Sequence, residues 1–179
     1  MQDVADIQRV LRGDMRAYAA LVNRYQSMVF VLVRSVCRST EDAQEITQDV
    51  FLKVYRQLYT FKGNASFRTW LYRIAYNTAI SWKRKSKVRE KAEDAYTRNE
   101  VYSARPADEE PDPEREEQYE RLRGLVEELP PQEKMLIELY YYKDLKMEEV
   151  AYISGMTLSN AKVRIFRIRQ KLQQAMTQA

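Results

Sequence analysis

The sequence predicts an all-α protein in which a flexible acidic linker joins two small helical domains. Apolar residues recur at intervals of three and four over long stretches, whereas alternating strand patterns bounded by turn pairs are scarce. Glycine occurs only four times in 179 residues, and 45% of the residues are hydrophobic, which is enough to build real cores. We place the domains at residues 1–90 and 118–179 and the linker at residues 91–117.

The N-terminal domain opens with two predicted helices. Asp14 is a suitable N-cap for the first helix, whose core-facing stripe consists of Tyr18, Leu21, Val22, Tyr25, Val29, Leu32, Val33 and Val36. Ser39 or Thr40 can cap the second helix, whose core face consists of Ala43, Ile46, Val50, Val54 and Leu58. The other side of the second helix is polar and includes Glu41, Glu45, Gln48 and Asp49.

The segment from residue 61 to residue 87 holds six aromatic and seven basic residues and no acid. Gly63 and Asn64 interrupt the helical pattern. Ser66 can cap a third helix, whose inward face consists of Phe67, Trp70, Leu71, Ile74, Ala75 and Thr78. Packing in the core therefore accounts for two of the six rings. The other rings, Phe61, Tyr72, Tyr76 and Trp82, fall in the loop or on the flank that carries Arg73, Asn77, Ser81 and Arg84.

Rings that core packing does not explain, lying beside cations, are typical of a surface for nucleic acid. Aromatic side chains stack on unpaired bases, and lysine or arginine side chains bind the phosphates. A ring at helical spacing is nevertheless more often part of a core than part of a ligand site. We expect Tyr72 and Tyr76 to be accessible to a ligand.

The linker is acidic and rich in proline. Its segment "RPADEEPDPEREE" has three prolines and too little apolar content to offset the entropy of ordering the chain. Residues 93–120 carry eleven acids against three arginines. This acidity either keeps the linker soluble, lets it run through a basic channel, or shields a basic face.

The C-terminal domain is predicted to end in a helix-turn-helix. Pro131 suits an opening turn, and Gly155 suits the C-cap of a short helix that begins near Lys146. Ser159 can cap the last helix after a turn of only a few residues. In that helix the core face consists of Ala161, Ile165, Ile168 and Leu172, and the opposite side presents Lys162, Val163, Phe166, Arg167 and Gln170. Cations with apolar side chains among them fit the major groove of DNA.

Composition argues against an enzyme. The chain has no histidine, the commonest general base and metal ligand, and it has no glycine-rich phosphate loop. Cys37 is the single cysteine, which excludes an internal disulfide framework and favours a reducing compartment. Because it lies in an apolar run, we expect a buried thiol. We expect no metal, no cofactor and no direct membrane insertion, and a cytoplasmic location, because neither a signal-peptide core nor an apolar run of about 18 residues is present.

Four segments in this order resemble the extracytoplasmic-function (ECF) sigma factors of bacterial RNA polymerase. They are "GDMRAYAALVNRY", "DAQEITQDVFLKVYRQL", "FKGNASFRTWLYRIAYNTA" and "LPPQEKMLIELYYYKDLKMEEVAYISGMTLSNAKVRIFRIRQKL". The resemblance spans nearly the whole chain. It implies that residues 1–90 form a sigma-2 domain, that residues 118–179 form a sigma-4 domain, and that the chain directs promoter-specific initiation without being an enzyme.

The resemblance also implies functional residues. Binding to the clamp helices of the polymerase beta-prime subunit is carried over to Glu45, Gln48, Asp49 and Lys53. Capture of the melted minus-10 single strand is carried over to Phe61, Asn64, Ala65, Ser66, Trp70, Tyr72, Arg73, Tyr76, Asn77, Ser81 and Arg84. Recognition of the minus-35 duplex is carried over to Ser159, Asn160, Lys162, Val163, Arg164, Phe166 and Arg167. Sigma-4 is expected to lie near the beta flap, and an anti-sigma factor is a further partner because the family often has such inhibitors.

Two departures from the family pattern leave the base preference open. The loop "GNAS" is variable in the family, and Ser159, Asn160 and Ala161 stand where many members have a Gly-Thr-Val step. Two competing hypotheses are a conventional helix-turn-helix regulator whose N-terminal half dimerises or senses a signal, and an RNA-modifying or hydrolytic enzyme. The aromatic and basic segment argues against the first, because a sensor domain does not need it, and the missing histidine argues against the second.

Overall fold

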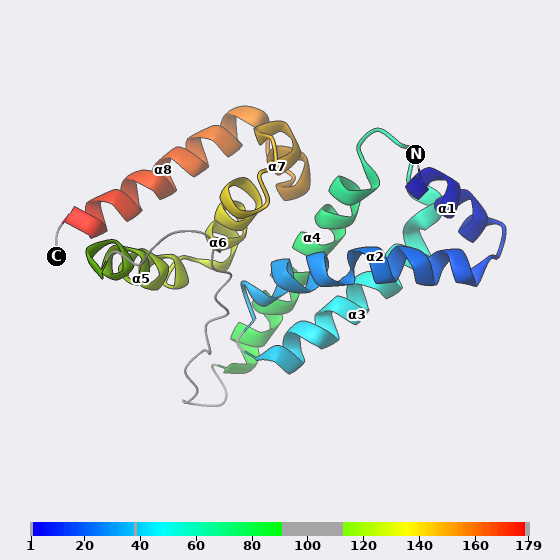
Figure 1. Cartoon of the computed structure of the whole chain (residues 1–179), viewed down its shortest axis with the longest axis horizontal. Helices are drawn as coiled ribbons and strands as arrows, with labels where there is room; N and C mark the ends of the chain where they lie inside the picture. The colour runs from blue at the N-terminus through cyan, green and yellow to red at the C-terminus, as the bar shows by residue number, and fades with distance from the viewer. Residues whose placement is uncertain (1, 38, 91–112, 178–179) are drawn as a thin grey trace.

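The protein folds into two helical bundles that pack against each other. The computed structural model describes residues 2–37, 39–90 and 113–177, so most of the predicted linker lies outside the described residues. Helices α1–α4 form the N-terminal bundle and α5–α8 form the C-terminal bundle, with α7 and α6 resting on α4 (Figure 1). Buried side chains from both bundles belong to one continuous hydrophobic core. No helix among the described residues is apolar enough over a sufficient length to cross a membrane.

The N-terminal bundle follows the predicted helical periodicity. Its elements are α1 (Gln2–Leu11), α2 (Met15–Arg34), α3 (Thr40–Gln57), a 3-10 turn η1 (Leu58–Thr60) and α4 (Phe67–Glu90). Asp14 caps α2 by accepting from the backbone N–H groups of Arg16 and Ala17, and Ser39 caps α3. Ser66 Oγ accepts from the backbone N–H of Thr69, which fixes the start of α4. The four predicted core residues that lie in α3 are buried, and so is the fifth, Leu58, which lies in η1.

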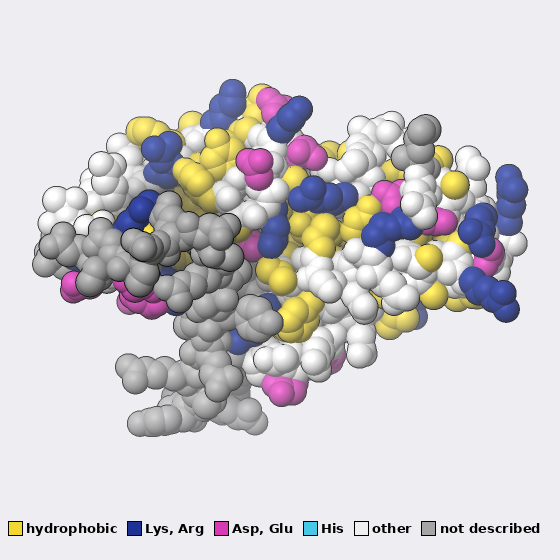
Figure 2. Space-filling view, in the orientation of Figure 1, with side chains coloured by type: hydrophobic (Ala, Val, Ile, Leu, Met, Phe, Trp, Pro, Cys, Tyr) yellow, Lys and Arg dark blue, Asp and Glu magenta, His cyan; other side chains and the backbone are white. Residues whose placement is uncertain are grey.

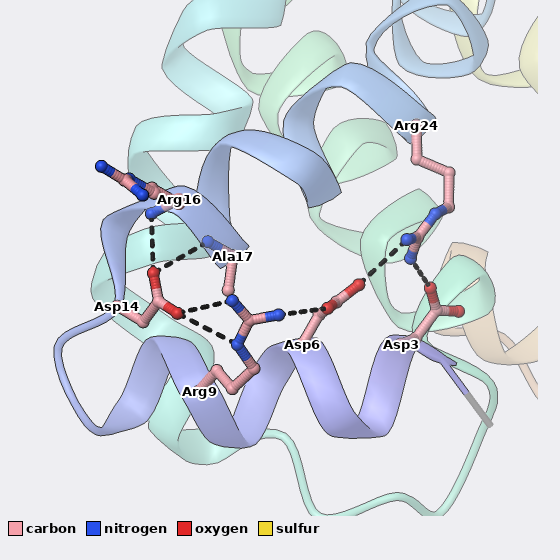
Figure 3. Close-up of polar contacts among 7 residues, drawn as sticks. All are labelled: Asp3, Asp6, Arg9, Asp14, Arg16, Ala17 and Arg24. Atoms are coloured by element: carbon pink, nitrogen blue, oxygen red, sulfur yellow. Dashed lines mark hydrogen bonds and ion pairs between the residues drawn. The ribbon is translucent and has the colours of Figure 1, made fainter.

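Helix α1 is an element that the periodicity analysis did not predict. Ile7 and Val10 are buried against the bundle, and ion pairs fasten the polar side of the helix. Arg24 of α2 reaches Asp6 at 2.9 Å and also binds Asp3, while Arg9 binds Asp14 at 2.8 Å (Figure 3).

The pKa of Asp14 lies below the usual aspartate value. The hydrogen bond from Arg9 is the main cause, and the backbone N–H of Ala17 adds to it. The same carboxylate therefore caps α2 and also links α1 to the start of α2.

The C-terminal bundle contains the predicted helix-turn-helix. Its elements are α5 (Pro113–Glu127), α6 (Pro131–Ile137), a π-helical turn η2 (Glu138–Tyr142), α7 (Met147–Ser154) and α8 (Leu158–Thr177). Helix α5 thus begins five residues before the predicted domain boundary at residue 118. Pro131 occupies the first turn of α6, and Gly155 ends α7 in the left-handed conformation with φ 71°, as predicted.

The predicted cap of α8 is wrong by two residues. Thr157, not Ser159, occupies the N-cap position, since its hydroxyl accepts the backbone N–H of Asn160 at 3.2 Å. Ser159 lies inside the first turn of α8. A threonine hydroxyl caps a helix almost as well as a serine hydroxyl, so residue type alone did not distinguish the two positions.

Candidate nucleic-acid interface

The loop between η1 and α4 forms one wall of a small hollow. Phe61 lies in this loop with its ring centroid 5.4 Å from that of Trp70 and 5.8 Å from that of Phe67. Gly63 allows the chain to turn with φ 74°, a conformation that other residues adopt with strain. The hollow has a volume of about 100 Å³ and is lined by residues 60–65, Trp70 and Tyr152. It therefore brings together backbone, rings and a cation from the loop with one ring from the C-terminal bundle.

A second hollow lies between α3 and α4. It has a volume of about 250 Å³ and is lined by Lys53, Gln57, Ile74, Asn77, Thr78 and Ser81. Lys53 Nζ donates a hydrogen bond to Thr78 Oγ1 at 3.2 Å, which turns the lysine toward α4. The structure thus places Lys53, which was predicted to contact polymerase, beside two residues predicted to contact the minus-10 strand. No pattern in the sequence indicates this position, because the neighbours of Lys53 come from another helix.

Tyr72 and Tyr76 contradict the expectation that they are accessible. Their residues are 0% and 4% exposed, because this flank of α4 is covered by the C-terminal bundle. Burial raises the pKa of both phenols, and for Tyr72 the nearby Arg68 guanidinium partly opposes that effect. Arg73 lies on the same flank, with its guanidinium carbon 4.7 Å from the ring centroid of Tyr152. The helical pattern of α4 could not anticipate a second bundle on this side.

The predicted polymerase-binding side of α3 is accessible apart from Lys53. Glu45, Gln48 and Asp49 are exposed, whereas Lys53 is half-buried. Leu52 and Tyr55 add large exposed apolar side chains to the same helix. The predicted polymerase-binding set did not include Leu52 and Tyr55. The signal that could have found them is that both are large apolar residues outside the core stripe of α3.

Helix α8 presents the predicted groove-facing side chains to solvent. Ala161, Ile165 and Ile168 are buried, whereas Val163 is 47% exposed and Phe166 is 57% exposed. The other exposed members of the predicted set are Ser159, Asn160, Lys162 and Arg167. Lys and Arg side chains lie among hydrophobic ones along this helix (Figure 2).

Arg164 differs from the other cations of α8. Its Nη2 atom lies 2.9 Å from Glu133 Oε1, and the residue is half-buried. This ion pair ties α8 to α6, so the Arg164 guanidinium has a structural role within the C-terminal bundle.

The described residues offer no site for a metal. Among them, no group of three or more His, Cys, Asp or Glu side chains is arranged to hold an ion. Cys37 is a buried free thiol, and burial raises its pKa to about 12. The thiol is therefore far less reactive than an exposed cysteine.

Comparison with known proteins identifies the two bundles. Residues 21–89 match the protein-family model described as Sigma-70 region 2, and residues 119–172 match the one described as Sigma-70, region 4. Over 96% of its length the chain aligns at 35% identity with the ECF RNA polymerase sigma-E factor of Escherichia coli, of which it covers 93%. The chain belongs to the ECF sigma factors of the sigma-70 family.

Other relatives agree with this assignment. The sigma factor is 31% identical to the RNA polymerase sigma-H factor of Pseudomonas aeruginosa, with 98% of this chain and 94% of that protein covered. Its fold resembles that of CnrH, solved in complex with the cytosolic domain of CnrY, with a TM-score of 0.69 at 21% identity and coverage of 99% and 98%. It also resembles the sigma factor RpoE from Bartonella quintana, solved with the anti-sigma factor NepR, with a TM-score of 0.68 at 19% identity and coverage of 89% and 96%.

The all-helical fold and the sigma-factor function predicted from the sequence are thereby confirmed. The chain is an RNA polymerase sigma factor that acts in transcription initiation and recognises promoters through regions 2 and 4. As a member of this family it is a DNA-binding subunit and not an enzyme. The hypotheses of a conventional helix-turn-helix regulator and of a hydrolytic enzyme are therefore set aside.

Proposed function

We propose that the hollow beside Trp70 binds a base of the melted minus-10 strand. The observation that carries this proposal is the arrangement of Phe61 and Trp70 around a space bounded by loop residues 63–65. An unpaired base gains about 1 to 3 kcal/mol from stacking on an aromatic side chain, and backbone groups of the loop can hydrogen-bond to its edge. Binding of exposed bases would offset part of the cost of opening the duplex, without ATP hydrolysis by the sigma factor.

The second hollow extends the proposed path of the strand along α4. Asn77 and Ser81 line it with polar atoms, and Lys53 adds a positive charge next to them. We assign Lys53 to strand binding rather than to polymerase, because its amine points to α4. Arg73 and Arg84 are proposed to bind phosphates on either side of this path, in accord with their positions on the basic segment.

The minus-35 element is proposed to bind the exposed side of α8. Lys162 and Arg167 would contact phosphates or guanine edges, while Val163 and Phe166 would meet thymine methyl groups in the major groove. Ser159 and Asn160 in the first turn are placed for contacts with the DNA backbone. Arg164 has a smaller part in this proposal, since Glu133 already neutralises its charge.

Core RNA polymerase, bound by sigma factors generally, is proposed to contact two surfaces of this chain. The exposed polar side of α3, with Glu45, Gln48 and Asp49, is assigned to the beta-prime clamp helices, and the C-terminal bundle to the beta flap. An anti-sigma factor is proposed as a further partner, in line with the anti-sigma factor bound to the structurally similar RpoE. The proposed location is the cytoplasm, where polymerase acts.

Reconstitution with core polymerase tests these assignments. The holoenzyme is mixed with a library of genomic promoters, transcripts are sequenced, and unpaired thymines are mapped with permanganate. We expect sigma-dependent start sites with reactive thymines in the minus-10 region. Start sites without any reactive thymine upstream would refute the strand-capture proposal.

A further inference from the structure

Helix α1 lies against the segment that leads into the hollow beside Trp70. It packs on α2 and on η1, the 3-10 turn that ends directly before Phe61 (Figure 1). Leu58, the first residue of η1, is buried, and its backbone oxygen accepts a hydrogen bond from the backbone N–H of Phe61 at 3.1 Å. The contacts of α1 with η1 therefore help to place the loop that carries Phe61.

A chain of side-chain contacts also runs from α1 to the hollow. Asp3 Oδ2 accepts a hydrogen bond from the hydroxyl of Tyr25 at 2.7 Å. The ring of Tyr25 meets the ring of Phe67 edge to face, with centroids 5.4 Å apart. The centroid of Phe67 lies 5.8 Å from those of both Phe61 and Trp70, the two rings that border the space proposed for a base. Each link is a direct contact, so a carboxylate of α1 is connected to the walls of the hollow.

The first link is suited to hold a ring in one place. A hydrogen bond from a phenol to a carboxylate is charge-assisted and stronger than one between neutral groups. Burial, together with the bond to Asp3, raises the pKa of Tyr25 to about 12, so the phenol stays protonated and donates at physiological pH. Arg24 pairs with the other oxygen of Asp3, which fixes the carboxylate itself (Figure 3).

The aromatic links carry this position toward the hollow. Phe67 is 4% exposed, whereas Phe61 and Trp70 are half-buried, so the rings lead from the core to the surface. Aromatic pairs have preferred distances and angles, and a close-packed interior leaves a ring little room to move. A shift of the Tyr25 ring would therefore displace Phe67 and change the spacing of the two outer rings. Core packing alone would need the ring of Tyr25 but not its hydroxyl.

We propose that α1 is a positioning element for capture of the melted strand, in which Asp3 and Tyr25 hold the rings of Phe61 and Trp70 at the spacing that accepts a base. Asp3 and Tyr25 act through Phe67, so both are positioning residues. This inference rests on the proposed binding of a minus-10 base in the hollow. A site whose rings are already in place loses less conformational entropy on binding, so freeing the rings weakens capture of the base.

The test measures base capture by the holoenzyme on a forked promoter. The minus-10 bases of the non-template strand are unpaired in this probe, and one position at a time carries 2-aminopurine, whose fluorescence falls when it stacks. The reporting position is the one at which Trp70→Ala abolishes the fall. We expect Tyr25→Phe, which removes only the hydroxyl, to weaken probe binding about fivefold and to reduce the fall in fluorescence. Asp3→Ala should do the same, and both losses in affinity should disappear when the reporting position is abasic.

A double variant and a matched control separate positioning from stability. If both residues act through one hydrogen bond, the double variant Asp3→Ala, Tyr25→Phe should bind the probe no more weakly than either single variant. Asp6→Ala removes the same charge from the same helix, and the ion pair with Arg24 at 2.9 Å, but leaves the bond between Asp3 and Tyr25 in place. We expect it to lower the urea midpoint while keeping wild-type affinity and fluorescence.

Three results would overturn the positioning role. They are wild-type probe binding by Tyr25→Phe, additive losses in the double variant, and a loss in Asp6→Ala equal to that in Asp3→Ala. If Asp3→Ala detached α1 altogether, Tyr25→Phe would decide by itself, because it keeps the ring and every ion pair of α1.

Failure of this role and failure of the proposed function give different results. If the wild-type holoenzyme binds the abasic probe as tightly as the intact one at every minus-10 position, the proposed capture of a base fails. If wild type requires the base and Tyr25→Phe binds it equally well, only the positioning role fails.

Discussion

Ile165 and Phe166 are neighbours on α8 with opposite surroundings, and alanine substitutions at the two positions should separate stability from DNA binding. Ile165 is 3% exposed, so Ile165→Ala removes three buried carbon atoms. At about 0.8 kcal/mol per carbon the lost transfer free energy is roughly 2.4 kcal/mol, and the cavity raises the expected loss in free energy of unfolding to about 3–4 kcal/mol. Phe166 is more than half exposed, and its substitution should cost less than about 1 kcal/mol.

Urea unfolding followed by circular dichroism measures the stability of both variants. Tryptophan fluorescence would not serve, because both tryptophans, Trp70 and Trp82, lie in α4 of the other bundle. Binding is measured with holoenzyme on a promoter, with and without an altered minus-35 element. We expect Phe166→Ala to weaken binding to the intact promoter on the order of fivefold, an effect that disappears when the minus-35 element is altered.

Two outcomes would refute this reasoning. If Phe166→Ala destabilised the protein as much as Ile165→Ala, the ring would be part of the core. If Phe166→Ala left promoter binding unchanged, the exposed side of α8 would not be the surface that reads the minus-35 element.

Four further predictions follow from the same structure. Asn77→Ala should reduce permanganate reactivity of minus-10 thymines while changing polymerase affinity little and stability by less than about 0.5 kcal/mol, because the side chain is exposed; equal loss of polymerase binding would contradict this. Removing Lys162 or Arg167 should reduce the slope of log affinity for the minus-35 duplex against log salt by about 0.9 each, and an unchanged slope would exclude that residue from the interface. Arg24→Ala should release α1, seen as faster proteolysis near the N-terminus and a lower urea midpoint, whereas wild-type cleavage would mean that Ile7 suffices to hold the helix. Cys37 should react with a thiol reagent at pH 8 roughly 1000-fold more slowly in native than in urea-unfolded protein, since burial raises its pKa from 9.0 to about 12; similar rates would show that the thiol is accessible.

The cores of the individual bundles were predictable from the sequence. Leu21, Val50 and Ile165 each belong to an apolar stripe that repeats with the helical period along its own helix. That stripe marks the side that the helix turns toward its own bundle. The caps Asp14 and Ser39 were predictable too, because a cap depends on neighbours within four residues.

Contacts between distant elements were not predictable in this way. Helix α1 is held by Arg24, which lies 18 residues from Asp6, so no local pattern indicates the pairing. Lys53 belongs to a polar side of α3, and only the position of Thr78 on α4 shows where its amine points.

The sequence by itself determined that the chain is helical, that it has a basic aromatic segment and a helix-turn-helix, and that these resemble an ECF sigma factor. Only the tertiary structure decided that Tyr72 and Tyr76 are covered and that Tyr152 and Glu149 face α4. The physical reason is that helical periodicity records burial against the nearest bundle, whereas the packing of two bundles depends on the summed contacts of residues about 80 positions apart, such as Thr69 and Glu149.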